Sequence, residues 1–279
     1  MGLAELVPGI SGGTIAFVTG IYTELVNSLA SFGPQSLLLL SRPQAFWRHH
    51  NLGFLLSLAA GMVVGILALA PVVRLLLAHA APLLWSFFFG LILASVVFIG
   101  RARSRAALAR YGTLGVILGA VFLAIPTGQV QGSWLALFIG SAIAVCAWIL
   151  PAVSGSFVLL LLGLYDDVIV AIADFNFLKL SAVGLGCAIG LASFVRMLSW
   201  LMQRHEDRLL SLLTGFMAVA LAKLWPWQNA EAGSLLKSLL LPAEYVSLTG
   251  QAAYLTGVLP AVAAGVVALW LLQRVTRQA

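Results

Sequence analysis

The sequence has few charged side chains, and this scarcity excludes an ordinary soluble domain. Only 9% of the 279 residues are Asp, Glu, Lys or Arg, whereas 62% are hydrophobic, and the mean hydropathy is +1.06. Soluble domains carry about 25% charged residues. Several apolar runs contain the roughly 20 residues that a helix needs to cross a bilayer. We therefore expect an all-α polytopic membrane protein.

Other absences narrow the function. The two cysteines, Cys146 and Cys187, lie in apolar segments without the spacing of metal ligands, so we expect no metal, disulfide or cofactor. The sequence contains no nucleotide-binding motif, so we expect no ATP hydrolysis by this chain. It also shows no basic region of the kind that begins a signal peptide. The net charge is +6, with arginines in short loops between apolar runs. This placement fits the positive-inside rule better than a nucleic-acid partner.

A proline-containing motif occurs twice in the apolar sequence. The first copy, 6–14, reads LVPGISGGT, and the second, 150–156, reads LPAVSGS. At a spacing of 143 residues, Pro8, Ser11, Gly12, Gly20 and Tyr22 correspond to Pro151, Ser154, Gly155, Gly163 and Tyr165. Proline and small residues should break a helix and leave backbone N–H groups free. Two such breaks in one membrane chain predict a transport site.

The two copies differ in what precedes them. An apolar segment, 134–149, precedes the second proline, but only seven residues precede Pro8. Either the first copy lacks most of this arm or the natural start lies upstream, and we favour the upstream start.

The repeat extends beyond the motif. At a spacing of 125 residues, Gly61, Gly65, Ser86 and Gly90 match Gly186, Gly190, Ser211 and Gly215, which indicates an internal duplication. Each half is then one broken hairpin and three spanning helices. The first half, 1–128, contains the motif 3–29, its short helix 14–30 and helices at about 52–78, 83–99 and 111–125. The second half, 129–279, contains the motif at about 134–172, including a helix 157–172, and helices at about 179–202, 209–225 and 250–273. We expect loops at 31–51, 203–208 and 226–249.

The distribution of charge predicts how the halves are threaded. If both motifs are re-entrant hairpins, all Lys and Arg residues except Arg74, Lys179, Lys223 and Lys237 fall on or near one side of the membrane. The positive-inside rule favours this arrangement. Three spanning helices per half is an odd number, so the second half must be inverted relative to the first. The broken tips then lie near mid-membrane.

The residues at the two tips are suited to bind an anion. A helix N-terminus offers free N–H donors and a partial positive charge, glycine lets an oxyanion approach, and hydroxyl groups add donors. The alternative is that these small residues only permit close helix packing in lipid. The candidate binding residues are Pro8, Gly9, Ser11, Gly12, Gly13, Thr14, Ser154, Gly155 and Ser156.

Three charged residues are further candidates. Arg74 and Arg196 lie inside apolar helices, within one turn of equivalent positions of the repeat. An intramembrane arginine is functional by default, and its planar fork suits a phosphate; the alternative is that each snorkels to the nearest interface. Glu5 is a counter-charge, a proton carrier or a residue at a solvated end.

The stretch from Glu5 to Thr14, ELVPGISGGT, continuing to Gly20-Ile21-Tyr22, resembles the signature of the bacterial polyprenyl-phosphate transporters. The resemblance covers essentially the whole chain, although Glu5 stands where Asp is commoner in that family. It implies a translocase, not an enzyme, that moves undecaprenyl phosphate across the bacterial cytoplasmic (inner) membrane for carrier-lipid recycling. The partners would be the polyprenyl phosphate lipid and the bilayer. A homo-oligomer, the coupling ion and the direction of net transport stay open.

Two other functions would use similar loops. A secondary carrier for a small anion would use the same site without a lateral opening for a lipid tail. An intramembrane polyprenyl-diphosphate phosphatase would need an arginine in the loop and an acid–base partner. Gly12 and Gly13 stand there instead, and the four histidines lie elsewhere in the sequence, which disfavours the enzyme.

Overall fold

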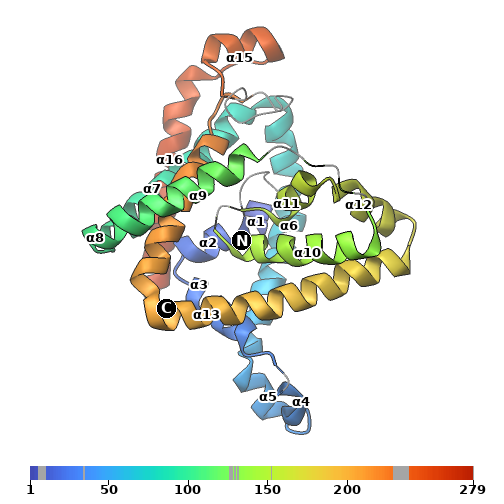
Figure 1. The fold of residues 1–279 in the computed structure, drawn as a ribbon. Coiled ribbons are helices and arrows are strands. Elements are labelled where there is room, and N and C mark those ends of the chain that lie inside the picture. Colours follow the sequence, from blue (N-terminus) through green and yellow to red (C-terminus); the bar gives the residue numbers. More distant parts are fainter. Residues whose placement is uncertain are drawn as a thin grey trace. The chain divides into compact units, whose positions relative to one another are not determined.

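The computed structural model describes residues 1–5, 11–33, 35–125, 128, 130, 132–151, 153–228 and 239–278. Within these residues the chain is helical without strands, which confirms the predicted all-α fold (Figure 1). Five helical stretches there are long and apolar enough to cross a membrane, and one bent pair would be a sixth. They are α6 (Leu52–His79), α7 (Ala81–Arg101), the stretch Arg105–Ala124, α13 (Phe177–Lys223) and α16 (Leu255–Gln278). These stretches support a multi-pass membrane protein.

The chain divides into two compact units, each built from separate stretches of sequence. Unit 1 contains Met1–Phe17, Ile21–Val64 and Pro126–Glu206. Unit 2 contains Val18–Gly20, Gly65–Ile125 and Asp207–Ala279. Each unit therefore takes residues from both predicted repeats, and the long helices α6 and α13 contribute to both units.

Each motif copy forms two short helices separated by a glycine. The helices are α2 (Gly12–Val18) and α3 (Tyr22–Ala30) in the first copy, and α11 (Gly155–Leu162) and α12 (Tyr165–Ala173) in the second. Gly20 and Gly163 separate them with φ of 81° and 74°, a conformation that glycine adopts without strain. The predictions of one helix at 14–30 and one at 157–172 are therefore wrong. The second pair is bent by 106°.

In both halves a single non-helical residue separates two long helices. Ala80, between α6 and α7, has φ −144° and ψ 39°, and His205, inside α13, has φ −140° and ψ 41°. The two residues lie 125 positions apart, which is the spacing of the predicted repeat. The predicted loop 203–208 is wrong, because the chain turns at His205 alone. The predicted helices 179–202 and 209–225 form the first and second arms of α13.

Glycines allow backbone contact between the helices of unit 2. Here α7 packs on α16, and the second arm of α13 packs on the helix that contains α9 (Thr113–Ala124). In each case a Cβ on the glycine would overlap the partner's carbonyl oxygen. The contacts join Gly90 to Val262, Gly265 to Phe87, Gly215 to Gly112 and Gly115 to Leu212. This is the small-residue packing of membrane helices, and its α7 and α13 positions are 125 residues apart.

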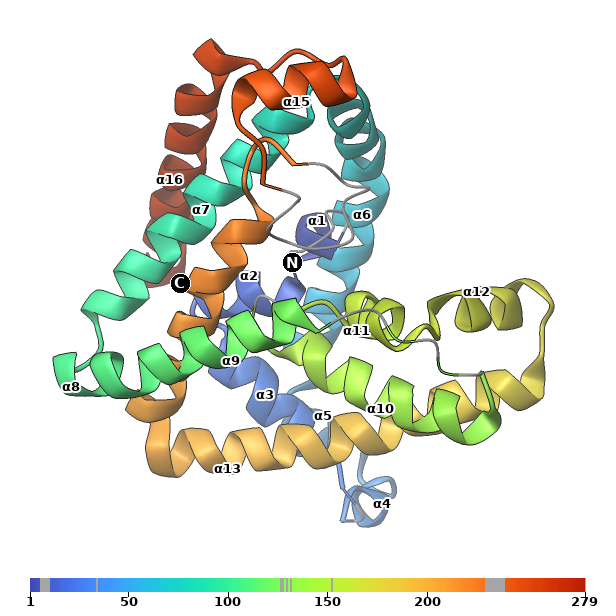
Figure 2. The same cartoon turned by 45° about the horizontal axis from the view of Figure 1, so that its top comes forward.

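Unit 1 contains a similar contact between α10 (Trp134–Ile149) and the first arm of α13, which run side by side (Figure 2). Gly186 lies against the backbone of Phe138, and Gly190 against that of Ala142. Lys179 at the start of α13 forms an ion pair of 2.7 Å with Asp167 of α12. Two helices of the second motif, α10 and α12, therefore both contact the first arm of α13.

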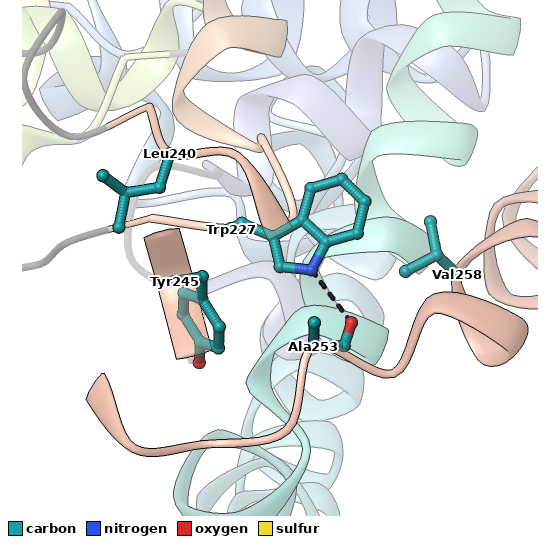
Figure 3. Packing of buried hydrophobic residues seen from close by; sticks show 5 residues of the cluster. All are labelled: Trp227, Leu240, Tyr245, Ala253 and Val258. Carbon is teal, nitrogen blue, oxygen red and sulfur yellow. Dashed lines mark hydrogen bonds between the residues drawn. The ribbon is translucent and has the colours of Figure 1, made fainter. Parts of the chain in front are cut away.

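Two of the predicted loops contain helices. The segment 31–51 forms α4 (Ser36–Leu39) and α5 (Pro43–His49), and the described part of 226–249 contains α15 (Pro242–Thr249). There Trp227 lies in a buried cluster with Leu240, Tyr245, Ala253 and Val258 (Figure 3). Its indole N–H donates to the carbonyl of Ala253 at 2.9 Å. The loop prediction at 226–249 fails because apolar side chains that are scattered in the sequence gather into one cluster.

Two helix boundaries also differ from those predicted. The helix expected at 111–125 begins earlier, with α8 (Arg105–Ala107) and a π-helical turn, η1 (Leu108–Gly112), before α9. The helix expected at 250–273 begins later, because Gly250 and Tyr254 have positive φ and α16 starts at Leu255.

Replacing Gly90 with alanine tests the close packing in unit 2. The new Cβ would overlap the carbonyl oxygen of Val262, so we expect Gly90→Ala to destabilise the protein by about 1–3 kcal/mol. Gly100→Ala, in the same helix, is the matched control, because its nearest neighbour would lie 3.6 Å away on the side chain of Leu108. Thermal unfolding in detergent measures both variants. Equal midpoints would contradict the packing.

Candidate functional site

The two motifs meet inside unit 1, where the carboxyl end of α10 faces the start of α2. The bounds of α10 are those that the sequence predicts. Its last carbonyls have no partners within the helix, and Pro151 follows shortly after. The hydroxyl of Ser11 donates to one of the adjacent carbonyls, that of Leu150, at 3.2 Å. A helix end rich in carbonyls thus faces a helix start rich in N–H groups, and their opposite partial charges favour this contact.

Gly13 and Gly155 permit close contacts at the two helix starts. A Cβ on Gly13 would lie 2.6 Å from the carbonyl oxygen of Ile149, and one on Gly155 would lie 2.6 Å from that of Ala144. Both distances are too short for a real side chain. At these two positions the structure therefore supports close packing, the alternative that the sequence leaves open.

The carboxylate of Glu5, at the end of α1 (Gly2–Glu5), occupies the start of α2. Its Oε1 accepts hydrogen bonds from the N–H of Gly12 at 2.7 Å and from the indole N–H of Trp148 at 3.0 Å. A Cβ on Gly12 would lie 2.6 Å from this oxygen, so a larger residue there would displace the carboxylate. The start of α2 therefore binds an oxyanion, and in this structure the oxyanion belongs to the protein.

The hydroxyl groups of the first motif are buried. Ser11 and Thr14 are each 1% exposed, and their hydroxyl oxygens lie 3.2 Å apart. The N–H of Thr14 donates to the carbonyl of Ser11 at 3.0 Å and to its Oγ at 3.3 Å. These hydroxyls therefore stabilise the start of α2 and its contact with α10.

The hydroxyl groups of the second motif are more accessible. The oxygens of Ser154 and Ser156 lie 2.8 Å apart at the start of α11; Ser156 is exposed and Ser154 is half-buried. The side chain of Ser154 makes no capping hydrogen bond to α11. The second motif thus presents two hydroxyl groups beside the start of α11, and the N-cap side chain accepts no hydrogen bond from the N–H groups there.

The remaining candidates are placed differently. Pro8 and Gly9 lie outside the described residues. Arg74 is an exposed residue of unit 2. Arg196 belongs to unit 1, where its Nη2 donates to the carbonyl of Phe32 at 2.6 Å.

Arg196 supports the turn that follows α3. The ring of Phe32 stacks on the imidazole of His50 at 4.2 Å, and Nδ1 of His50 is 2.8 Å from the hydroxyl of Ser31. Burial, with a smaller contribution from His49, lowers the pKa of His50 and favours its neutral form. Arg196 thus has a structural partner in the backbone of this turn.

Sequence reasoning missed Trp148 and the carbonyl of Leu150, which contact the first motif. A signal for Trp148 exists: it lies 143 residues after Glu5, at the equivalent position of the repeat, three residues before Pro151. In the described part of the chain, no group of three or more His, Cys, Asp and Glu side chains could hold a metal ion.

The apolar spans indicate a polytopic membrane protein, and two broken helices that meet within it are a feature of many transporters. Residues 1–238 match the VCA0040-like family, described as undecaprenyl phosphate translocase-like. The chain therefore belongs to this family, whose description indicates a transporter and not an enzyme.

Two relatives are named as polyprenyl-phosphate transporters. The chain is 41% identical over 268 residues to a polyprenyl-phosphate transporter of Vibrio cholerae, which covers 90% of this chain and 86% of the relative. It is 30% identical over 247 residues to a polyprenyl-phosphate transporter of Staphylococcus aureus, which covers 81% of this chain and 83% of the relative. No solved structure matches the chain.

Gly13→Ala tests the junction between the motifs. Its Cβ would lie 2.6 Å from a backbone oxygen that cannot move alone, so we expect a loss of about 1–3 kcal/mol in stability. Gly184→Ala, on α13 of the same unit, has nothing within 4 Å of its new Cβ and should be neutral or slightly stabilising. Thermal unfolding in detergent compares them, and a Gly13→Ala variant as stable as Gly184→Ala would be evidence against the junction.

Proposed function

We propose that this protein translocates undecaprenyl phosphate across the bacterial cytoplasmic membrane and so recycles the carrier lipid of envelope synthesis. The family description and the names of both relatives support a polyprenyl phosphate as the substrate. We assign the phosphate headgroup to the Ser-Gly loops, residues 11–14 and 154–156. The observation that carries this assignment is the carboxylate of Glu5, held 2.7 Å from the N–H of Gly12.

A phosphate oxygen and a carboxylate oxygen accept the same charge-assisted hydrogen bonds. The donors that hold Glu5 can therefore hold a lipid phosphate once the carboxylate moves away. The two anions repel each other, so only one of them occupies the start of α2 at a time. In our proposal the exposed hydroxyl pair of Ser154 and Ser156 receives the headgroup, and the phosphate then exchanges with Glu5 at Gly12.

The proposed route keeps the lipid tail in the bilayer while the headgroup crosses through protein, because a phosphate in hydrocarbon is very costly. In this proposal the two repeats are inverted, and the motifs are re-entrant hairpins with tips near mid-membrane. The 106° bend between α11 and α12 supports a re-entrant second motif. A headgroup at the tips is then accessible in turn from either leaflet.

Removing the exposed hydroxyl pair tests the headgroup assignment. Each hydrogen bond to a charged group contributes about 1.5–3 kcal/mol, so Ser154→Ala with Ser156→Ala should weaken binding of undecaprenyl phosphate by at least about tenfold. Cells that depend on this variant should expose more undecaprenyl phosphate on their outer surface. Ser193→Ala, an exposed serine of α13 that bonds only its own helix, is the control. Normal binding by the double variant would contradict the assignment.

Two further assays separate the alternatives. Uptake of labelled inorganic phosphate into liposomes that contain the purified protein would indicate a small-anion carrier. Phosphate release from undecaprenyl diphosphate would indicate a phosphatase. We expect neither activity, and movement of undecaprenyl phosphate between leaflets instead.

A further inference from the structure

A groove runs along the part of α6 that belongs to unit 2. Its volume is about 580 Å³, and its described lining extends from Ile66 to His79. The lining is apolar except for Arg74 and His79. At 1.5 Å per residue this stretch is about 20 Å long. The groove is therefore an apolar track with a cation along its length.

The lining residues recur at intervals of three and four positions, so they share one face of the helix. The face is open: Leu67 is 72% exposed and Leu75 is 61% exposed. In a protein that spans a membrane, such a face is open to hydrocarbon. A single extended hydrocarbon chain can lie along it.

Arg74 differs from Arg196 in how its charge is satisfied. Arg196 donates to the backbone of Phe32, whereas Arg74 has no hydrogen bond, ion pair or ring contact with any described residue. An arginine in an apolar span is costly unless an anion or a polar group compensates its charge. The imidazole of His79 is directed elsewhere, since its Nδ1 lies 3.1 Å from the carbonyl of Leu75. Arg74 is thus suited to bind an anion that arrives with an apolar chain.

We propose that the α6 groove binds the isoprenoid tail of the transported lipid, with the guanidinium of Arg74 bound to its phosphate. This inference rests on the proposed function and adds a second site for the same substrate. Arg74 provides paired N–H donors to two phosphate oxygens. Apolar burial of the tail along Leu67, Ala70 and Leu75 adds affinity in proportion to the area covered.

The chemistry of the groove selects this occupant. Inorganic phosphate would leave the apolar track empty, and an uncharged prenol would leave Arg74 without an anion. The track follows one face of one helix, which suits one chain better than the two chains of a bilayer phospholipid. A lipid with a single long tail and a phosphate monoester satisfies both features.

A pair of tryptophan variants tests the tail site. Ala70 lines the groove and Ala68 does not, and both lie on α6 two residues apart. Binding of undecaprenyl phosphate and of undecaprenol to purified protein is measured by native mass spectrometry. Native mass spectrometry counts the bound lipids, so the groove is read separately from the Ser-Gly loops. Ala70→Trp should weaken binding of both lipids at the groove at least tenfold, because the indole fills the track. Ala68→Trp, whose side chain is exposed, should change neither by more than twofold.

Arg74→Gln tests the headgroup contact separately. This variant should weaken binding of undecaprenyl phosphate in the groove at least tenfold. Its affinity for undecaprenol should stay within twofold of the wild type, because only the phosphate contacts residue 74. Unfolding midpoints near that of the wild type show that the variants are folded.

Three results would overturn the inference. If Ala70→Trp and Ala68→Trp bound both lipids with equal affinity, the tail would not lie in the groove. The proposed function would still stand if the wild type moved the lipid. A phospholipid retained by the wild type and lost in Ala70→Trp, with undecaprenyl phosphate unaffected, would assign the groove to bilayer lipid. Failure of the wild type to bind undecaprenyl phosphate would refute the proposed function as well.

Discussion

The junction between the end of α10 and the start of α2 is the contact on which the candidate site depends. A break in an apolar helix leaves backbone groups without partners, and hydrocarbon offers none. Here the broken ends satisfy one another: Ser11 bonds the carbonyl of Leu150 at 3.2 Å, and Gly13 lies against the carbonyl of Ile149. The two motifs, 143 residues apart in sequence, are thereby held in one compact unit.

The carboxylate of Glu5 places a negative charge at this junction. The partial positive charge at the start of α2 would be uncompensated in a membrane, and the carboxylate compensates it through Gly12. Trp148 orients the same oxygen from the second copy. In the proposed mechanism, this internal anion compensates the start of α2 whenever no lipid phosphate is bound there. The same proposal requires that a substrate carry negative charge in order to replace Glu5.

The parts of the fold that follow from local rules could be predicted from the sequence. The apolar run before Pro151 gives α10 its bounds, and the predicted pair Gly20 and Gly163 share a positive φ. The similar conformations of Ala80 and His205 are not predicted from the sequence. The loop prediction at 203–208 fails because polar side chains are compatible with a helix, so polarity alone does not mark a loop. The cluster around Trp227 and the pairing of Glu5 with Trp148 depend on contacts between distant segments, which periodicity does not encode. Periodicity likewise does not show that Arg196 has a backbone partner in Phe32, whereas Arg74 has no partner among the described residues.

Binding of undecaprenyl phosphate to purified wild-type protein and to Glu5→Gln tests the exchange of anions most directly. The side-chain amide oxygen of this variant accepts the same two hydrogen bonds without the negative charge, so the junction keeps its geometry. We expect Glu5→Gln to bind the lipid phosphate more tightly than the wild type, because the competing charge is gone, while its affinity for undecaprenol stays unchanged. Unchanged or weaker binding of the phosphate by a folded Glu5→Gln variant would contradict a shared site for Glu5 and the headgroup.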